Sequence, residues 1–568
     1  MSRLRSSTLT ARGPSAAALV VALMALSGCG GGGGGSPAPA PASSSPGAPP
    51  ASTPAPAAAP APSAPIPADG KISVGSGCTT QYTITALPVS SGADPLLGQQ
   101  WHLKNTGQNG ATVGEDLRAF DAWVSNRGEG ARIAIIDESI EVTHPDLRPN
   151  LVDGGSRSYR PGNPYTAWPL PCDASSTHGT SVAGIAVGRN DNASGGAGVA
   201  PRAAMVAFDA LASDVDVDIA DALTRDAALN LVYHNSWGAP DDGALHPADA
   251  AFRAAIDQGV RTGRGGRGSI YVFSAGNGGC YAPTRLGGCQ QDNSNYDGYV
   301  NQRPVIAVCA VDDSGKRPSY GEPGANITVC APSSGGRNGI TTTTTASGYR
   351  TDFTGTSASA PMVSGVTGLM LTANPALTWR DVRLILARTA RRNDAADAGW
   401  SPSALGAGIA FNHKYGFGVV DANAAVAAAR TWTSVGGSDT LRSCTASATP
   451  NRVLPDATAT DTGTAVTDTL TIAGCAITKI EFVEVKLTAP HAYSGDLRVR
   501  LVSPTATESR LAERRACSGG CGSYADWSFG SMRHLDELAN GAWQLELTDL
   551  APQDTGTFQS WSLTIHGR

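Results

Sequence analysis

The chain has 568 residues, enough for two or three domains with sizeable cores. Its formal net charge is −6, and 6% of its residues are aromatic. Without a global basic field, we expect no nucleic-acid partner.

The N-terminal segment predicts export. Arg3, Arg5 and Arg12 precede the apolar run AAALVVALMAL, which is shorter than a membrane-spanning helix requires. The run ends in LSGC, which resembles a bacterial lipobox, where the cysteine (Cys29) is acylated after signal cleavage. A plain secretory signal with a chance cysteine is the alternative. We therefore predict a lipoprotein signal peptide over 1–29 and an exported protein, anchored by lipid to the bacterial outer membrane or cell surface, or released.

Composition divides the rest of the chain into three parts. Residues 30–93 are a linker rich in Gly, Pro and Ala, followed by a short ambiguous segment. From 94 to 435, buried strand patterns such as ARIAIID, AMVAFDA and SIYVFSAG alternate with helical patterns, which predicts an α/β domain with a parallel sheet. From 436 to 568, alternating runs such as ITKIEFVEVKLT and WQLELTDL predict an all-β sandwich or jelly roll.

The cysteines indicate disulfides. Ten remain after Cys29, an even number in an exported chain. The sequence does not fix their pairing, but short spacings favour Cys280–Cys289, Cys309–Cys330, Cys444–Cys475 and Cys517–Cys521, which leaves Cys78 with Cys172.

Three motifs carry the residue types of a serine-protease triad. Asp137 ends the strand ARIAIID, His178 begins the helical pattern of THGTSVAG, and Ser357 begins that of GTSASAP. A helix start has unpaired N–H groups and a positive dipole end, which suit a nucleophile whose product is an oxyanion. The order Asp, His, Ser is that of subtilisin. Asn277, in SAGNGG, is the predicted oxyanion donor, although a lone asparagine there would be read as a turn residue.

The motifs IIDESIEVTHPDL, HGTSVAG, SAGNGG and GTSASAP resemble the four signatures of subtilases. NSWGAPDDG (235–243), DNSNYDGY (292–299) and LTWRDVRLILARTA (377–390) are similar to the kexin and furin branch, the proprotein-convertase-like proteases. The region from HAYSGDLRVRLVSP to GTFQSWSLTIHG resembles the P (homo B) domain of that branch. The resemblance covers about 94–568 and implies a serine endopeptidase that cleaves after Arg or Lys.

The resemblance also implies a substrate-binding set. Asp241 and Asp297 match the acidic residues of the specificity pocket, and a substrate cation would relieve the cost of their burial. Glu138 matches one acidic residue of the next subsite, but its family partner is replaced by Ser175, so we expect a weaker dibasic preference. The remaining predicted substrate-binding residues are Ser236, Trp237 and Gly238, which match the edge strand that pairs with substrate, and Tyr299.

Calcium is implied in the same way, since hard cations prefer carboxylate and carbonyl oxygens. One matched site comprises Asp94, Asp146 and Asn192, with loop carbonyls near Arg189, Ser194 and Gly196. A second, below the specificity pocket, comprises Asp241, Asp292 and Glu322. The segment SRSYRPGNPYT replaces an Asp-rich loop, so we expect a third family site to be absent.

The segment before Asp94 leaves no room for an ordinary propeptide, and Lys71 is its one basic residue after Cys29. We therefore expect folding to proceed unaided or with a separate helper protein. Two other interpretations remain: a catalytically silent surface adhesin, which should have lost a triad residue, and an esterase or lipase, which usually shows G-x-S-x-G and the order Ser, Asp, His. The expected partners are protein or peptide substrates with basic residues.

Overall fold

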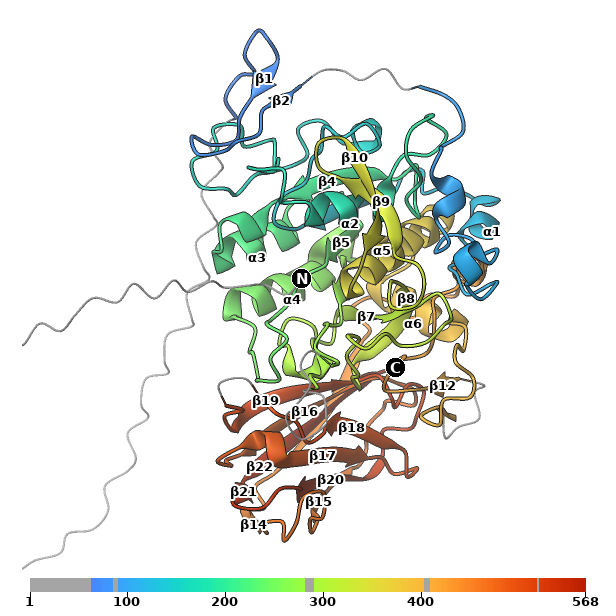
Figure 1. Ribbon diagram of the computed structural model, residues 1–568. Coiled ribbons are helices and arrows are strands. Elements are labelled where there is room, and N and C mark those ends of the chain that lie inside the picture. Colours follow the sequence, from blue (N-terminus) through green and yellow to red (C-terminus); the bar gives the residue numbers. More distant parts are fainter. Residues whose placement is uncertain (1–62, 85–89, 281–290, 403–408, 518–519) are drawn as a thin grey trace, which may run out of the picture. The chain divides into compact units, whose positions relative to one another are not determined.

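The computed structural model describes residues 63–84, 90–280, 291–402, 409–517 and 520–568. The described residues form one compact unit (Figure 1). The predicted lipidated cysteine, Cys29, and the predicted signal peptide lie outside these residues. Within them, none of the helices combines the length and apolarity needed to cross a bilayer.

The first half of the described chain is built on a parallel sheet, as its alternating pattern predicts. Six strands pair in the order β4-β3-β5-β6-β7-β8, and every pairing is parallel. Their apolar residues are almost all buried, which is typical of a sheet covered on both faces. The strands are β3 (Arg132–Ile136), β4 (Ala204–Phe208), β5 (Val232–Asn235), β6 (Ile270–Ser274), β7 (Val305–Val311) and β8 (Ile327–Pro332). We call this part, with its helices, the α/β region.

The longest helix, α5 (Thr356–Ala373), packs against β3 and β5 to β8. Its small residues allow this contact: a Cβ on Gly365 would lie 2.6 Å from Val199 Cβ. The other helices are α1 (Ala119–Trp123), α2 (His178–Val187), α3 (Asp216–Thr224), α4 (Ala250–Thr262), α6 (Trp379–Thr389) and α7 (Ala422–Thr431). Three antiparallel pairs complete this part: β1 (Lys71–Ile72) with β2 (Tyr82–Thr83), β9 (Ile340–Thr344) with β10 (Gly348–Phe353), and β11 (Ser401–Pro402) with β12 (Ala410–Phe411).

The C-terminal part of the chain, from β13 onward, is an antiparallel β-structure, which we call the β region. One sheet has the order β13-β22-β16-β19 and the other β15-β20-β17-β18, with β14 and β21 as a separate pair. Apolar side chains of both sheets, including Val485, Leu501 and Trp543, form one core, which confirms the predicted sandwich. The strands are β13 (Arg442–Ala448), β14 (Arg452–Leu454), β15 (Val466–Ile472), β16 (Ile480–Ala489), β17 (Leu497–Val502), β18 (Glu508–Ala512), β19 (Tyr524–Ser531), β20 (Gly541–Asp549), β21 (Gly556–Phe558) and β22 (Ser560–Gly567).

The two regions share buried polar and apolar contacts. Arg380 on α6 forms a two-pronged ion pair with Glu481 on β16, and both side chains are fully buried. Leu384 on α6 also belongs to one apolar cluster with Phe482 of the β region. These contacts fix the β region against the α/β region. The domain boundaries inferred from composition stay predictions.

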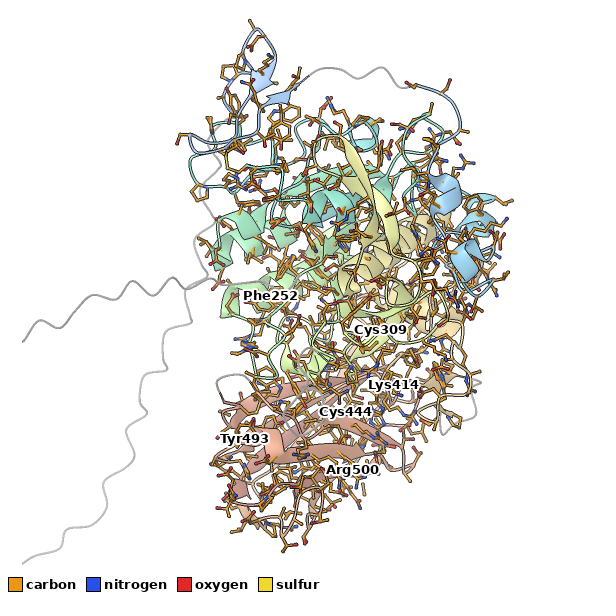
Figure 2. All side chains as sticks on the ribbon, viewed as in Figure 1. Phe252, Cys309, Lys414, Cys444, Tyr493 and Arg500 are labelled. Atoms are coloured by element: carbon orange, nitrogen blue, oxygen red, sulfur yellow. A yellow bond between two sulfur atoms is a disulfide. The ribbon has the colours of Figure 1, made fainter. Side chains whose placement is uncertain are left out.

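Four of the favoured disulfides are present. They are Cys78–Cys172, Cys309–Cys330, Cys444–Cys475 and Cys517–Cys521. Cys309 and Cys330 are register partners on the neighbouring strands β7 and β8, and Figure 2 shows Cys309 in the α/β region and Cys444 in the β region. Cys280 is also disulfide-bonded, and Cys289, its predicted partner, lies outside the described residues.

Candidate active site

Asp137 and His178 are brought together at the C-terminal edge of the parallel sheet. Asp137 directly follows β3, and its two carboxylate oxygens lie 2.9 and 3.0 Å from His178 Nδ1. Gly179 permits this approach, since a Cβ there would lie 2.3 Å from the carbonyl oxygen of Ser139. The carboxylate is 1% exposed, so its attraction to an imidazolium is little screened by water. The pair therefore has the geometry of the aspartate and histidine of a triad.

Ser357 is the second residue of α5, at the helix N-terminus. Its hydroxyl donates a 3.3 Å hydrogen bond to the carbonyl oxygen of Ser236, and the Ser236 hydroxyl donates to the Ser357 carbonyl oxygen at 3.0 Å. His178 Nε2 has no hydrogen-bond partner among the described residues. The histidine is therefore held by Asp137 on one side, while its other nitrogen is not engaged by the serine.

Asn277 lies beside the start of α5. Its side-chain oxygen accepts hydrogen bonds from the Thr356 N–H at 2.8 Å and from the Thr356 hydroxyl at 3.1 Å. The asparagine oxygen is therefore engaged, which leaves the amide NH₂ as the group that can donate to a ligand. Gly355, at φ 84°, caps the helix, and a Cβ on it would lie 3.2 Å from the Asn277 oxygen. Glycine thus gives the turn its left-handed backbone and leaves room for Asn277.

Asp297 has the environment of a charge-selective pocket. Its carboxylate accepts backbone hydrogen bonds from Ala239 at 2.8 Å and Tyr299 at 2.7 Å, and a Cβ on Gly238 would lie 2.3 Å from it. Burial raises the pKa of Asp297 to about 6. Asp297 and Asp241 both line one small cavity beside Gly276. Asp292 and Glu322 line the same cavity, so a cation that entered it would meet four carboxylates.

Two predicted substrate-binding residues point their side chains elsewhere. Trp237 is 3% exposed and donates its indole N–H to the carbonyl oxygen of Ile136, and its ring centroid lies 5.7 Å from that of Tyr299. Tyr299 is 6% exposed and also stacks edge-on against Phe252. Both rings belong to the core, so only the backbone of these residues can contact a substrate.

Asp241, Asp292 and Glu322 gather around Gly278, where a Cβ would lie within 3.2 Å of all three side chains. Burial raises the pKa of each, and for Asp292 to about 7. Backbone N–H groups bind them: Gly278 donates to Glu322 and Gly243 to Asp292, each at 2.8 Å. No ion pair joins them to an Arg, Lys or His of the described chain.

The other predicted calcium group is also assembled. Asp94 accepts hydrogen bonds from the backbone of Asp191 and Asn192, and the Asn192 side chain donates to Asp146 at 2.8 Å. Burial raises the pKa of Asp146 to about 7. Gly195 precedes the loop carbonyl of Gly196, and a Cβ on it would lie 2.2 Å from Asp146. In the residues that the structure describes, no three His, Cys, Asp or Glu side chains already have the spacing of a metal centre.

The structure adds one acidic residue that the sequence analysis missed. Asp173 accepts hydrogen bonds from the Ser175 backbone N–H at 2.8 Å and from the Ser175 hydroxyl. These bonds hold the pKa of Asp173 below its usual range. Its charge also acts on Glu138, whose pKa is raised by burial and by Asp137. Ser175, which stands where the family carries an acid, is therefore hydrogen-bonded to a carboxylate two residues earlier. Cys172, the neighbour of Asp173, forms a disulfide, and this cysteine is the feature of the sequence that indicates a fixed turn here.

An Asp–His pair at the edge of a parallel sheet, with a serine and an asparagine at one helix start, is the arrangement expected of a subtilisin-like serine protease. A family model described as the subtilase family matches residues 128–418, and one for the proprotein convertase P-domain matches residues 480–565. The chain belongs to the subtilase family and carries a P domain, as the motifs predict.

Relatives place it near the convertases. The chain is 33% identical to the dibasic-processing endoprotease of Schizosaccharomyces pombe, over 84% of this chain and 65% of the relative, and 33% identical to human neuroendocrine convertase 2, over 84% and 74%. Among solved structures, the serine protease of Aeromonas sobria has a TM-score of 0.73 at 26% identity, covering 88% of this chain and 98% of that one. The same protease in complex with a chaperone has a TM-score of 0.72 at 25% identity, covering 89% and 99%.

Proposed function

We propose that this protein is a calcium-dependent serine endopeptidase that cleaves peptide bonds after Arg or Lys. The observation that carries the proposal is the Asp137–His178 pair at the edge of the parallel sheet. Ser357 and Asn277 at the start of α5, and a cavity lined by four carboxylates, support it. The relatives named as convertases support the choice of substrate. A silent adhesin would need neither the catalytic pair nor the acidic pocket.

The proposed reaction uses the groups in named roles. Ser357 Oγ attacks the carbonyl carbon while His178 Nε2 takes its proton, and the same nitrogen later protonates the leaving amine. Asp137 holds the proton on Nδ1 and stabilises the imidazolium. The Asn277 amide and the Ser357 backbone N–H donate to the oxyanion. Losing one such donor typically costs about 100- to 1000-fold in rate.

Specificity for a basic residue before the cut comes from Asp297 and Asp241. Both carboxylates are held by backbone N–H groups rather than by a cation of the chain, so a substrate guanidinium or ammonium would supply the missing charge. Glu138 and Asp173 supply negative charge on the side of His178, which favours a second basic residue. Ser236 and Gly238 offer backbone groups to an extended substrate.

Calcium fits two groups of the chain. Asp241, Asp292 and Glu322 would hold one ion: they are buried together, and burial raises the pKa of all three because no cation of the described chain pairs with them. Asp94, Asp146 and Asn192 would hold another, with the loop that carries Arg189, Ser194 and Gly196. Bound calcium would supply positive charge that stabilises both loops. We expect no third ion.

We also propose a location and a folding partner for the protein. A lipid on Cys29 would hold it outside the cytoplasm, on the outer membrane or cell surface unless it is released. A separate folding helper is supported by the Aeromonas sobria protease, which is known in complex with a chaperone. Expression of the gene without its neighbours tests this: abundant active enzyme would remove the need for a helper.

The decisive experiment compares fluorogenic peptides with Lys-Arg, Ala-Arg and Ala-Phe before the scissile bond. We expect cleavage of the first two and not of Ala-Phe. Ser357→Ala should lower kcat/KM by at least about 1000-fold, because the nucleophile is gone. Cleavage of Ala-Phe at a similar rate would retain the protease and reject the acidic pocket. A folded protein that cleaves none of the three would favour the adhesin.

A further inference from the structure

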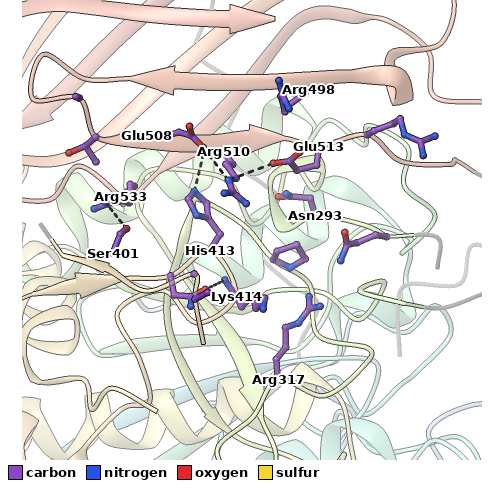
Figure 3. Close-up of a pocket in the computed structure, with 18 of the residues that line it drawn as sticks. Asn293, Arg317, Ser401, His413, Lys414, Arg498, Glu508, Arg510, Glu513 and Arg533 are labelled. Atoms are coloured by element: carbon purple, nitrogen blue, oxygen red, sulfur yellow. Dashed lines mark hydrogen bonds and ion pairs between the residues drawn. The ribbon is translucent and has the colours of Figure 1, made fainter. Parts of the chain in front are cut away.

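A large cavity lies where the α/β region meets the β region, and it shares Asn293 with the small cavity that Asp241 and Asp297 line. Its volume is about 960 Å³, which is in the range of small-molecule sites. Figure 3 shows Arg317 and Lys414 reaching into it from the α/β region, and Arg510 and Glu513 from the β region. Both regions therefore contribute charged side chains to one space.

The lining is rich in cations although the whole chain is acidic. Its cationic side chains are Arg317, Lys414, Arg498, Arg510, Arg514 and Arg533, and its acidic ones are Asp461, Glu508 and Glu513. Lys414 and Arg498 pair with carboxylates just outside the lining, Asp397 at 2.6 Å and Glu546 at 3.8 Å. The positive charge that the chain leaves uncompensated in this cavity is therefore carried by the arginines that have no carboxylate partner.

Two of these arginines have no carboxylate partner in the part of the chain that the structure describes. Arg317 donates to the carbonyl oxygen of Gly321 at 2.8 Å, and Arg533 to Ser401 Oγ at 2.8 Å and to the carbonyl oxygen of Pro402. Arg533 is 7% exposed, and its Nε has no partner among the described atoms. Burial lowers the pKa of both guanidinium groups, so their charge is incompletely compensated.

Two further arginines of the cavity have carboxylate partners within it. Arg510 pairs with Glu508 at 3.1 Å, and Arg514 with Asp461 at 2.9 Å. His413 Nε2 accepts the Arg510 backbone N–H at 2.9 Å, so its proton lies on Nδ1 and makes the ring a neutral donor. Burial and nearby arginines lower the pKa of His413 to about 3, which keeps the ring neutral.

We propose that this cavity binds a phosphate group, either free or as a phosphomonoester. Guanidinium groups bind phosphate oxygens in paired hydrogen bonds, and a dianion would offset the charge of Arg317 and Arg533. The volume exceeds that of phosphate alone, which leaves room for an organic part of the ligand. Because the ligand would contact both regions, it would stabilise the folded chain by an amount that grows with the logarithm of free ligand concentration above Kd.

The test is thermal unfolding and calorimetric titration of the full chain with inorganic phosphate and with O-phosphoserine. Free calcium and ionic strength are held fixed, and sodium chloride serves as the reference salt. We expect saturable binding heat and a Tm that keeps rising with probe concentration above Kd, with a larger effect for O-phosphoserine if the ligand is an ester and an equal effect if it is free phosphate. Arg317→Gln in the α/β region and Arg533→Gln in the β region should each weaken binding by about tenfold or more, since each removes a charge-assisted contact.

Arg261→Gln is the matched control, because Arg261 is an exposed arginine on α4 outside this cavity and pairs with Asp257. It should bind both probes like the unchanged chain. No saturable heat or Tm change with either probe would overturn the proposal. So would binding equal to that of Arg261→Gln in whichever of Arg317→Gln and Arg533→Gln is folded.

Discussion

Buried carboxylates are paired with a cation of the chain in one part of the molecule and have no such partner in another. Where the α/β region meets the β region, Glu481 is fully buried and bound by Arg380 through two hydrogen bonds, and Arg568 adds a third at 3.0 Å. Beside the candidate active site, Asp292 and Glu322 are 5% and 3% exposed, and neither forms an ion pair within the described chain.

The pKa values move in opposite directions for this reason. Burial alone would raise the pKa of Glu481, but the hydrogen bonds and charge of Arg380 hold it below its usual range. Burial raises the pKa of Asp292 to about 7, because the nearest strong partners are N–H groups and other acids. A buried charge with its partner in the chain stabilises the fold, whereas one without a partner indicates a site for a cation from outside.

The largest expected effect comes from breaking the paired cluster. Arg380→Met should lower the free energy of unfolding by about 3–5 kcal/mol, because it leaves Glu481 buried without its main partner. Arg380→Met combined with Glu481→Met should recover most of that loss. Urea unfolding of the two variants measures it, and a double variant no more stable than the single one would contradict this view of the pair.

Removal of calcium should have the next largest effect. At a free calcium concentration 100 times Kd, binding contributes about 2.7 kcal/mol to stability, which a chelator removes. We expect a lower Tm in chelator, restored by calcium and not by magnesium, which requires a smaller, more regular site. Asp292→Asn should shrink the calcium-dependent shift. An identical Tm with calcium and with chelator would reject the calcium sites.

Replacing the specificity carboxylate should affect catalysis and leave the fold intact. Asp297→Asn removes one charge-assisted contact worth about 1.5–3 kcal/mol, so kcat/KM for Ala-Arg peptides should fall by about 10- to 150-fold. The variant should unfold at the same or a higher Tm, since a buried unpaired charge is lost. Asp242→Asn, beside the pocket but paired with His246, is the matched control.

The pH dependence of this preference follows from the raised pKa of Asp297. The carboxyl is charged above about pH 6 and neutral below it, so attraction for a substrate Arg should weaken as the pH falls through 6. The effect on the free energy of unfolding has the opposite sign. The folded state keeps the Asp297 proton up to a higher pH than the unfolded state does, so Asp297 lowers the free energy of unfolding as the pH rises from about 4 to about 6. In Asp297→Asn, the pH profile of kcat/KM for Ala-Arg peptides should no longer fall as the pH drops through 6.

The smallest effect is expected at Asp173. It is exposed, so its attraction for a second basic residue is screened by solvent. Asp173→Asn should lower the preference for Lys-Arg over Ala-Arg peptides by up to about fivefold, and leave Ala-Arg cleavage unchanged. Asp153→Asn, an exposed aspartate paired with Arg148, is the control. If the two peptides are cleaved in the same ratio by both variants, Asp173 has no part in specificity.

Much of the fold and of the site could be read from the sequence because the signals are local. The strand before Asp137 and the helix starts at His178 and Ser357 are patterns of a few neighbouring residues, and parallel strands place their C-terminal ends at one edge. The short-range disulfides follow for the same reason: Cys309 and Cys330 lie on successive strands that pair directly.

The tertiary structure decided what depends on residues far apart in the chain. Arg380 and Glu481 are separated by 101 positions, and no local pattern pairs them. Side-chain direction also depended on packing: Trp237 and Tyr299 lie in a suitable motif, yet their rings fill the core. A turn also brings the Asp173 carboxylate onto Ser175, a contact that the motif does not indicate. A sequence states which charges exist, and only the folded chain determines which of them are paired, because pairing depends on distance and burial.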